Sequence, residues 1–381
     1  MNHVKFCKEA YQAYHRFIEK ELPPEFDELQ AKRQEITSAV IAGEDVDIAA
    51  LTEDERQYVL ERRHHKIKER VQAIATKPKE VTWTHYNAVC YLAARLAANF
   101  TSLSAVFNEI KMSDPEFRPR ILFDFGSGIG TTMYTANHAW PNNIAEHFNV
   151  ELSQEMNDIS RQLLQGGHDD QPMLYNNVFY RQYLPVSSTI KYDLVVSAFS
   201  LVDLPSYSAR VNVIENLWEK TSDMLVICEY GSRDGFRAVL EARNLILEKS
   251  GYDVTKSYYT ESAETAVVPA VAKPTAHIVA PCPHHMACPR LFTGGPVKCF
   301  FETHYNQIDY GQDSSQKVVQ SERFSYVVLR RGPQPDRQFN LWPRVIQPCP
   351  KKGGLVYTRV CCPDGSYKEV KFTKSKHQGY V

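Results

Sequence analysis

Short apolar runs alternate with helical stripes through the middle of the chain. Apolar residues three or four positions apart predict a helix, and a compact apolar run between turn residues predicts a buried strand. The predicted strands cover residues 121–125, 147–151, 192–201 and 224–230, and the predicted helices cover 131–139, a segment carrying Met156, Ile159, Leu163 and Leu164, then 211–218 and 236–247. This alternation predicts an α/β protein, in which a parallel sheet has helices on both faces.

The first part of the chain has a helical pattern only. Residues 4–112 predict helices, and the apolar stripe at 83–112 is typical of core packing. The charged stretch at 51–77 is typical of a solvated helix face, with a face turned toward RNA as the alternative. The first twenty residues are amphipathic but contain acidic side chains, which argues against a signal peptide and against an ordinary mitochondrial presequence.

The alternation stops after residue 251. Residues 262–300 are rich in Ala, Pro, His and Cys, and a further strand is predicted at 324–329. Two β-rich runs at 355–361 and 367–373 flank Pro363-Asp364-Gly365-Ser366, which predicts a hairpin. The expected regions are N-terminal helices at 1–112, a Rossmann-like core at 113–260, a cysteine-rich metal-binding insertion at 261–305, and a final core strand with a C-terminal β extension at 306–381.

Composition limits the class of protein. The chain has 381 residues, of which 43% are hydrophobic and 23% charged, as in ordinary globular proteins. The net charge of −1 argues against a strongly basic nucleic-acid coat protein, although local asymmetry of charge leaves RNA binding open. No apolar run approaches the roughly 18 residues that a membrane helix needs, so no membrane span is expected.

A glycine-rich turn follows the predicted strand at 121–125. Gly126 permits a tight turn, Gly128 lets the backbone approach a ligand, and the helix after Gly130 begins with free N–H groups. Glu151 ends the next predicted strand, where a carboxylate can accept both ribose hydroxyls of a nucleotide. The turn and the acid together predict a nucleotide-binding site.

NAD, FAD and S-adenosylmethionine all fit such a turn. The third glycine comes two residues after the second, and Asp124 comes just before the turn, which favours S-adenosylmethionine. The predicted strand at 192–201 should end beside the cofactor, so that Ser197 and the residues after it face the methyl group. The predicted cofactor-binding residues are Asp124, Gly126, Gly128, Gly130, Glu151 and Ser197.

The part of the predicted site where methyl transfer would occur has few candidate catalytic groups. The segment lacks the Asn/Asp-Pro-Pro-aromatic sequence of amino-group methyltransferases, and it has no Pro-Cys nucleophile pair. Asp203 is a candidate base, and a helix cap before Pro205 is an equally good interpretation. We therefore assign no catalytic residue from the sequence.

Cysteines gather near the C-terminus. Cys282, Cys288 and Cys299 are close in sequence, and Cys349 and the Cys361-Cys362 pair follow. Nine cysteines without a secretory signal argue against a disulfide framework, which makes metal ligation the main prediction and unliganded thiols the alternative.

Zinc and an iron–sulfur cluster are both open as the metal group. Structural zinc favours short Cys-x2-Cys pairs, whereas a cluster takes four thiolates at looser spacing. Cys361, at the end of a predicted strand, is the preferred fourth ligand, and Cys349 or Cys362 could replace it. Such a cluster would join the cysteine segment to the C-terminal hairpin, so metal binding would supply folding energy. His284 and His285 are expected to be exposed, with ligation as the alternative.

Six motifs together resemble one family. They are DFGSGIGT at 124–131, YDLVVSAFSLVDLP at 192–205, CPHHMACP at 282–289, FSYVVLRR at 324–331, WPRVIQP at 342–348 and VCCPDG at 360–365. The chain resembles the mitochondrial small ribosomal subunit methyltransferase-like assembly factors, a family with bacterial and fungal relatives. The similarity runs from about residue 80 to 375, and the cysteine motifs are its most specific part.

The resemblance implies a class I, Rossmann-like S-adenosylmethionine methyltransferase fold and a 4Fe–4S cluster. Matched motif by motif, the cluster ligands fall on Cys282, Cys288, Cys299 and the Cys361-Cys362 pair, of which Cys361 is favoured. The resemblance also implies a monomer in the mitochondrial matrix that acts on the small ribosomal subunit, contacts its rRNA and ribosomal proteins and supports mitochondrial translation. It further implies weak or lost catalysis.

Two functions compete for this sequence. The first is an assembly factor that binds rRNA and uses cofactor and cluster structurally, and the second is an active rRNA methyltransferase of the small subunit. A radical S-adenosylmethionine enzyme is a third, disfavoured by the long gaps between cysteines. Basic residues in the tail would contact phosphates, and Trp342 could stack on a base. The basic candidates are Arg330, Arg331, Arg344, Lys351, Lys352, Arg359, Lys371, Lys374 and Lys376.

Overall fold

The structure is a computed structural model of the chain. It describes residues 83–373 apart from 169, 186–188, 258–274, 293–298, 307–318 and 336–341, with a few isolated positions before residue 83. The chain divides into two compact units, one formed by Glu9–Thr82 and the other by the rest. The predicted charged helix at 51–77 and Lys374 and Lys376 lie largely or wholly outside the described residues.

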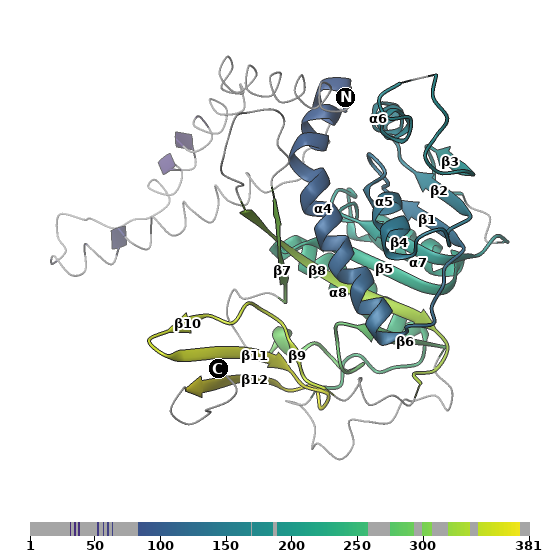
Figure 1. Ribbon diagram of the computed structural model, residues 1–381. Coiled ribbons are helices and arrows are strands. Elements are labelled where there is room, and N and C mark those ends of the chain that lie inside the picture. The colour runs from purple at the N-terminus through teal and green to yellow at the C-terminus, as the bar shows by residue number, and fades with distance from the viewer. Residues whose placement is uncertain are drawn as a thin grey trace. The chain divides into compact units, whose positions relative to one another are not determined.

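A mixed sheet forms the centre of the larger unit (Figure 1). Its strands are ordered β3-β2-β1-β4-β5-β8-β6, with β7 paired to β8. They are β1 (Ile121–Phe125), β2 (Glu146–Val150), β3 (Val178–Arg181), β4 (Tyr192–Ala198), β5 (Thr221–Tyr230), β6 (Ala276–Ala280), β7 (Phe301–Asn306) and β8 (Val319–Arg331). The first five in this order run parallel, and β8 lies antiparallel between β5 and β6. This is the expected class I methyltransferase fold.

The strand order reverses between β1 and β4. Strands β2 and β3 follow on one side of β1, whereas β5 lies on the far side of β4. In open α/β sheets, ligands bind in the crevice outside the carboxyl ends of the strands at such a switch point. The glycine turn follows β1 and Glu151 follows β2, so the topology places the predicted nucleotide-binding residues at this crevice.

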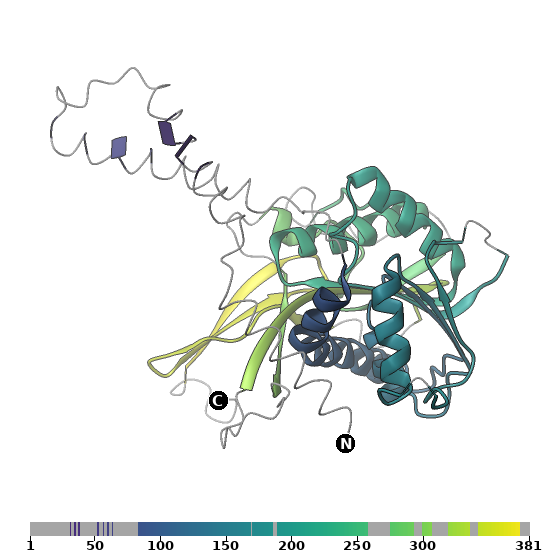
Figure 2. The same ribbon diagram turned by 90° about the horizontal axis from the view of Figure 1, so that it is seen from above.

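Helices cover both faces of the sheet (Figure 2). They are α4 (His85–Ser113), α5 (Thr131–Ala139), α6 (Gln154–Leu164), α7 (Tyr207–Lys220) and α8 (Arg233–Lys249). Leu194 and Val196 of β4 pack on the side of α4 and α5, whereas Val195 between them packs on the side of α7 and α8. The side-chain alternation along one strand thus supplies two separate cores.

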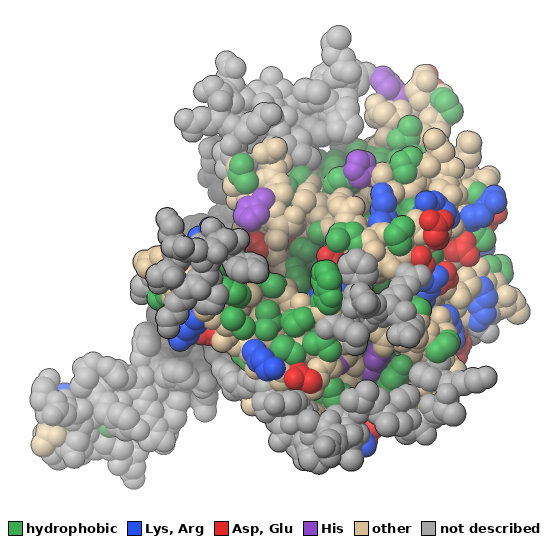
Figure 3. All heavy atoms as spheres, turned by 60° about the horizontal axis from the view of Figure 1, so that its bottom comes forward, with side chains coloured by type: hydrophobic (Ala, Val, Ile, Leu, Met, Phe, Trp, Pro, Cys, Tyr) green, Lys and Arg blue, Asp and Glu red, His purple; other side chains and the backbone are tan. Residues whose placement is uncertain are grey.

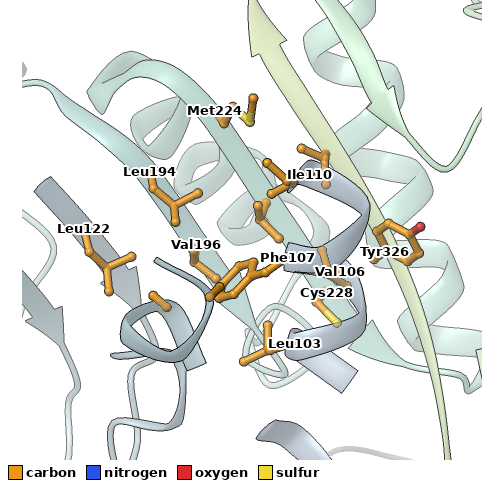
Figure 4. Packing of buried hydrophobic residues seen from close by; sticks show 14 of the residues in the cluster. Leu103, Val106, Phe107, Ile110, Leu122, Leu194, Val196, Met224, Cys228 and Tyr326 are labelled. Carbon is orange, nitrogen blue, oxygen red and sulfur yellow. The ribbon is translucent and has the colours of Figure 1, made fainter. Parts of the chain in front are cut away.

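Helix α4 confirms the predicted core stripe at 83–112. Its residues Leu103, Val106, Phe107 and Ile110 are at most 1% exposed and pack beside Leu122, Leu194 and Met224 (Figure 4). By length and composition alone α4 also meets the criterion for a membrane span, which the sequence argument from uninterrupted apolar runs did not detect. In this structure α4 packs against the central sheet, and its apolar side chains form part of the core.

A second sheet is formed by the C-terminal strands β9 (Arg344–Val345), β10 (Lys351–Lys352), β11 (Leu355–Cys361) and β12 (Tyr367–Thr373). Strands β11 and β12 pair antiparallel from Leu355↔Thr373 to Cys361↔Tyr367, which confirms the predicted hairpin. Gly365 in the connecting turn has φ +77°, a conformation that glycine adopts without strain.

Strands β3, β6 and β7 were not predicted. The five residues of β6 are all buried, so they show no alternation of apolar and polar positions. The strand lies inside the segment that was expected to be a cysteine-rich insertion, and it belongs to the central sheet. Strand β4 ends at Ala198, three residues earlier than predicted, because Phe199 has φ +56° and turns the chain.

Candidate functional site

The glycine turn after β1 adopts the conformation that its glycines permit. Gly126, Gly128 and Gly130 have φ values of +68°, +51° and +82°. A Cβ at Gly126 would lie 2.3 Å from that of Ser200, whereas nothing lies within 4 Å of a Cβ at Gly128. The turn is therefore packed against the β4 loop at its first glycine and open at its second, where a ligand can approach the backbone.

Glu151 is joined to the glycine turn by hydrogen bonds. Its carboxylate oxygens accept from the Gly128 N–H and from the Ser153 N–H, both at 2.9 Å. Burial raises the pKa of Glu151, these backbone N–H groups oppose the rise, and the charge of Asp203 adds to it. The predicted acid and the predicted turn therefore lie together at the mouth of the crevice.

Asp124 lies beneath the turn and is fully buried. Burial raises its pKa to about 7, the Thr132 hydroxyl opposes this rise, and the charge of Glu151 adds to it. Helix α5 begins directly after Gly130, which provides no side-chain cap, so its first N–H groups are available to a ligand. The crevice thus offers carboxylates for a cationic ligand with hydroxyl groups.

The end of β4 is closed by internal hydrogen bonds. Ser197 is fully buried, and its hydroxyl lies 2.8 Å from the Ser200 hydroxyl, which donates to the Phe125 carbonyl oxygen at 3.2 Å. The sequence predicted that Ser197 faces a cofactor methyl group. In this structure its side chain connects the β4 loop to the end of β1, and its role toward a cofactor stays a prediction.

Phe199 and Tyr230 cover the adjoining end of β5. Their ring centroids are 4.7 Å apart, and the Arg95 guanidinium lies 4.7 Å from the centroid of Tyr230. The positive φ of Phe199 is uncommon for a bulky residue and is held by a hydrogen bond from its N–H to the Cys228 carbonyl. Aromatic side chains therefore lie together at the ends of β4 and β5.

Glu229 is a buried carboxyl that the sequence analysis missed. One of its oxygens accepts from the N–H groups of Ser200 and Leu201, at 3.0 and 2.7 Å. Burial raises its pKa to about 8, against the effect of these N–H groups, and the charge of Asp203 adds to the rise. Glu229 thus holds the loop after β4.

Asp203 is not a helix cap, although the sequence allowed that interpretation. Helix α7 begins at Tyr207, and the Ser206 hydroxyl accepts from the Ala209 N–H as its cap. Asp203 instead lies near Glu151 and Glu229, and burial raises its pKa. It belongs to the acidic crevice.

Four cysteines from three chain segments line one cavity. It is bounded by Cys282 and Cys288 in the segment after β6, by Cys299 before β7, and by Cys361 at the end of β11. Its empty volume is about 320 Å³, part of it open to solvent. All four thiols are free of disulfide bonds. The structure therefore brings together the four predicted ligands, including the one 62 residues beyond Cys299.

Burial raises the pKa of three of these thiols. The pKa of Cys288 rises to about 11, that of Cys299 and that of Cys361 are raised as well, and the neighbouring thiol groups add to each rise. Within the described part of the chain, no three His, Cys, Asp or Glu side chains are grouped closely enough to hold a single metal ion. The donor set nevertheless has the chemistry of a thiolate metal site.

The sequence predicted that the two histidines of the cysteine motif are exposed, and this prediction is wrong. His284 is only 4% exposed, and its Nε2 lies 3.3 Å from the Cys361 sulfur. His285 is half-buried: its ring stacks on Tyr252 at 4.4 Å, and its Nε2 accepts from the Ile278 N–H. The prediction failed because the short segment folds back against β6 instead of forming a surface loop.

Arg243 of α8 supports the cysteine segment from the core side. It is 2% exposed and donates to the carbonyl oxygens of His284 and Met286, at 3.1 and 2.7 Å. It also lines a second cavity together with Cys282, Cys288 and Cys299. A buried guanidinium here stabilises nearby negative charge on sulfur. The sequence held one signal for this buried role, because Arg243 lies on the apolar stripe of the predicted helix at 236–247.

Several basic residues predicted to contact phosphates have partners within the chain. Arg330 pairs with Asp114 and Asp223, at 2.5 and 2.6 Å. Arg331 donates to carbonyl oxygens at the end of α7, including that of Trp218, and covers its ring. Both arginines therefore hold the C-terminal end of β8 to neighbouring elements, and their predicted phosphate contacts stay a prediction.

The other tail residues predicted to contact RNA differ in whether they pair with an acidic side chain or lie exposed. Arg344 pairs with Glu109 at 3.5 Å and Arg359 with Glu369 at 3.3 Å. Lys351 and Lys371 are exposed, and Trp342 is 61% exposed. On the face shown in Figure 3, Lys and Arg side chains are scattered, several of them beside acidic ones, and do not form one basic surface.

A family model and several curated proteins match most of this chain. The family model described as mitochondrial small ribosomal subunit Rsm22 matches residues 85–381. The human ribosome assembly protein METTL17, mitochondrial, is 35% identical over 302 residues, which is 78% of this chain and 60% of that protein. The Rsm22-cox11 tandem protein 2, mitochondrial, of Schizosaccharomyces pombe is 24% identical over 334 residues, covering 77% of this chain and 41% of that protein. This chain thus spans 60% or less of the length of these curated relatives.

Among solved structures, the magnesium protoporphyrin IX methyltransferase of Synechocystis with bound SAH is similar over 66% of this chain and 89% of its own. The sequence identity is 11% and the TM-score is 0.35.

Glu229 should make stability depend on pH. Its pKa of about 8 in the folded chain exceeds the ordinary value of 4.5, so the folded state binds this proton more tightly. The contribution of Glu229 to the free energy of unfolding should therefore be fully present below a pH of about 4.5 and be lost as the pH rises to about 8, by up to about 1.4 kcal/mol per pH unit. Glu229→Gln keeps an acceptor oxygen and removes the charge, so urea unfolding of this variant should show a shallower decline. Glu248→Gln, on the exposed side of α8, is the control, and equal slopes in Glu229→Gln and wild type would contradict the assignment.

Arg243→Met should loosen the cysteine segment, because two buried carbonyl groups lose their donor. We expect a loss of about 3 kcal/mol in unfolding free energy, and faster reaction of the metal-free thiols with a thiol reagent. Arg237→Met on the same helix, whose side chain is 74% exposed, should change stability by no more than about 0.5 kcal/mol. Unchanged thiol reactivity in Arg243→Met would show that the arginine does not hold the segment.

Proposed function

This chain belongs to the mitochondrial small ribosomal subunit Rsm22 family, and on that premise we propose that it is an assembly factor of that subunit. It acts in the mitochondrial matrix, binds rRNA and supports mitochondrial translation. It carries S-adenosylmethionine in the crevice of its methyltransferase fold and a 4Fe–4S cluster between its two sheets. The observation that carries the proposal is the cavity lined by Cys282, Cys288, Cys299 and Cys361.

The four thiols suit a cluster because of where they come from. Three belong to segments attached to the central sheet, and Cys361 belongs to the second sheet. Their side chains line one shared cavity, and Arg243 lines an adjoining cavity together with three of them. A bound cluster would connect the two sheets through its four ligands, so its binding energy would stabilise their docking.

S-adenosylmethionine suits the crevice after β1 and β2. Glu151 would accept hydrogen bonds from the ribose hydroxyls, and the open backbone at Gly128 leaves room for the ligand. The positive sulfonium and amino groups of the cofactor would lie among carboxyl groups, which include Asp124 and Asp203. When bound, this cofactor can supply a methyl group.

Catalysis is proposed to be weak or absent. The rings of Phe199 and Tyr230 occupy the end of β4 and β5, with Arg95 over Tyr230. Arg95 is itself engaged, because it donates to Glu322 at 2.9 Å and to Asn99 at 3.0 Å. A nucleobase that was to accept a methyl group would have to displace this set of contacts, so the cofactor serves the fold more than a reaction.

The rRNA contacts are proposed for the second sheet. Lys351 and Lys371 are exposed there, and Trp342 has a largely exposed ring that can stack on an unpaired base. Few unpaired cations in the described tail imply few phosphate contacts, and hence a modest salt dependence of binding.

The cluster is tested by chemical analysis of anaerobically purified protein. We expect about four irons and four acid-labile sulfides per chain. Cys282→Ser and Cys361→Ser should lose both, since each removes one ligand from the cavity. Cys349→Ser is the matched control, because Cys349 is exposed and does not line this cavity.

Two outcomes would revise this proposal. Zinc without sulfide would replace the cluster by a structural zinc site and leave the fold intact. Loss of iron in Cys362→Ser, with iron retained in Cys361→Ser, would move the fourth ligand to the neighbouring position.

Glu151→Gln should weaken binding of S-adenosylmethionine by about 10- to 100-fold, since a hydrogen bond to a charged group contributes about 1.5–3 kcal/mol. Isothermal titration calorimetry measures this directly. Glu146→Gln, at the opposite end of β2, is the control and should bind as wild type does. Equal affinities of Glu151→Gln and wild type would place the ribose elsewhere.

A further inference from the structure

A histidine lies against one of the four thiols. The His284 Nε2 is 3.3 Å from the Cys361 sulfur, and the two residues are 4% and 7% exposed. They come from different parts of the fold, His284 from the segment after β6 and Cys361 from the end of β11. This contact links the segment that carries Cys282 and Cys288 directly to the second sheet.

The imidazole ring of His284 can meet the Cys361 sulfur as either partner of a hydrogen bond. A neutral imidazole has one N–H donor and one acceptor nitrogen. It can therefore accept a hydrogen bond from a thiol and, as the other tautomer, donate one to a thiolate.

We propose that His284 is a positioning residue for the cluster, which holds Cys361 in both of its states. In the metal-free chain its Nε2 accepts the Cys361 S–H. When Cys361 binds iron as a thiolate, its proton would pass to Nε2 while the Nδ1 proton is released to solvent, so that the ring stays neutral and its Nε2–H donates to the sulfur. This inference rests on the proposed cluster and adds a residue that is not one of its ligands.

The donated bond has a redox consequence. Hydrogen bonds to cluster sulfurs are among the factors that set the reduction potential of an iron–sulfur cluster. A donor stabilises the more negative, reduced state, so it raises the potential. Outer-shell partners of metal ligands also affect retention, typically by 10- to 100-fold in affinity.

The first test uses three variants of the full chain, loaded and purified without oxygen. His284→Leu should retain four irons, show a more negative midpoint potential in an EPR-monitored titration, and lose iron to a chelator about tenfold faster. His284→Gln, which keeps an N–H donor, should restore most of both values. His285→Leu removes a neighbouring ring that contacts Tyr252, and should leave the potential unchanged.

The second test needs no variant. Reduced wild-type protein labelled with 15N-histidine should show a weak nitrogen hyperfine coupling to the cluster. A strong coupling would mean that a histidine ligates iron, and no coupling would mean that His284 does not contact the ligand; either result overturns the proposal. An unchanged potential in folded His284→Leu overturns it too, while the cluster stands. Absence of iron and sulfide from the wild type overturns the cluster and this proposal together.

Discussion

The parallel strands at the centre of the main sheet are buried on both faces, and the positions of both candidate sites follow from this burial. Burying a charged group along these strands is costly, so carboxyl groups lie near the strand ends. Asp124, Glu151 and Glu229 all lie at or just beyond the carboxyl ends of their strands. The helices that bury the second face include α8, which carries Arg243 to the cysteine segment.

The two sites are therefore supported by different parts of one scaffold. The crevice is built from turns that directly follow parallel strands, and its geometry is fixed by the backbone. The cysteine cavity is built from three segments that lie far apart in sequence, and it depends on side chains such as Arg243 and His284. A thiolate ligand set at the junction of two sheets would give the second sheet an anchor that its own short strands do not provide.

Much of the core could be predicted from the sequence, because the relevant signals are local. The helix at 131–139 and the hairpin at 355–373 follow from apolar spacing and turn residues, and the structure confirms both. Strand β6 was not predicted, because His277 interrupts its short apolar run and the flanking sequence is rich in Ala and Pro. The burial of His284 and the pairing of Arg330 with Asp114 and Asp223 could not be predicted either, because each depends on a contact between distant segments.

The contact between Gly126 and Ser200 has a consequence for genetics. Any side chain at position 126 would place its Cβ 2.3 Å from the Ser200 Cβ, in a backbone conformation that already disfavours it. An allele that replaces this glycine would then misplace the β4 loop and lower the amount of folded protein, whatever it did to cofactor binding. Failure of such an allele to rescue a knockout would report on protein abundance, whereas a replacement at Glu151 would separate the role of the ligand from that of the fold.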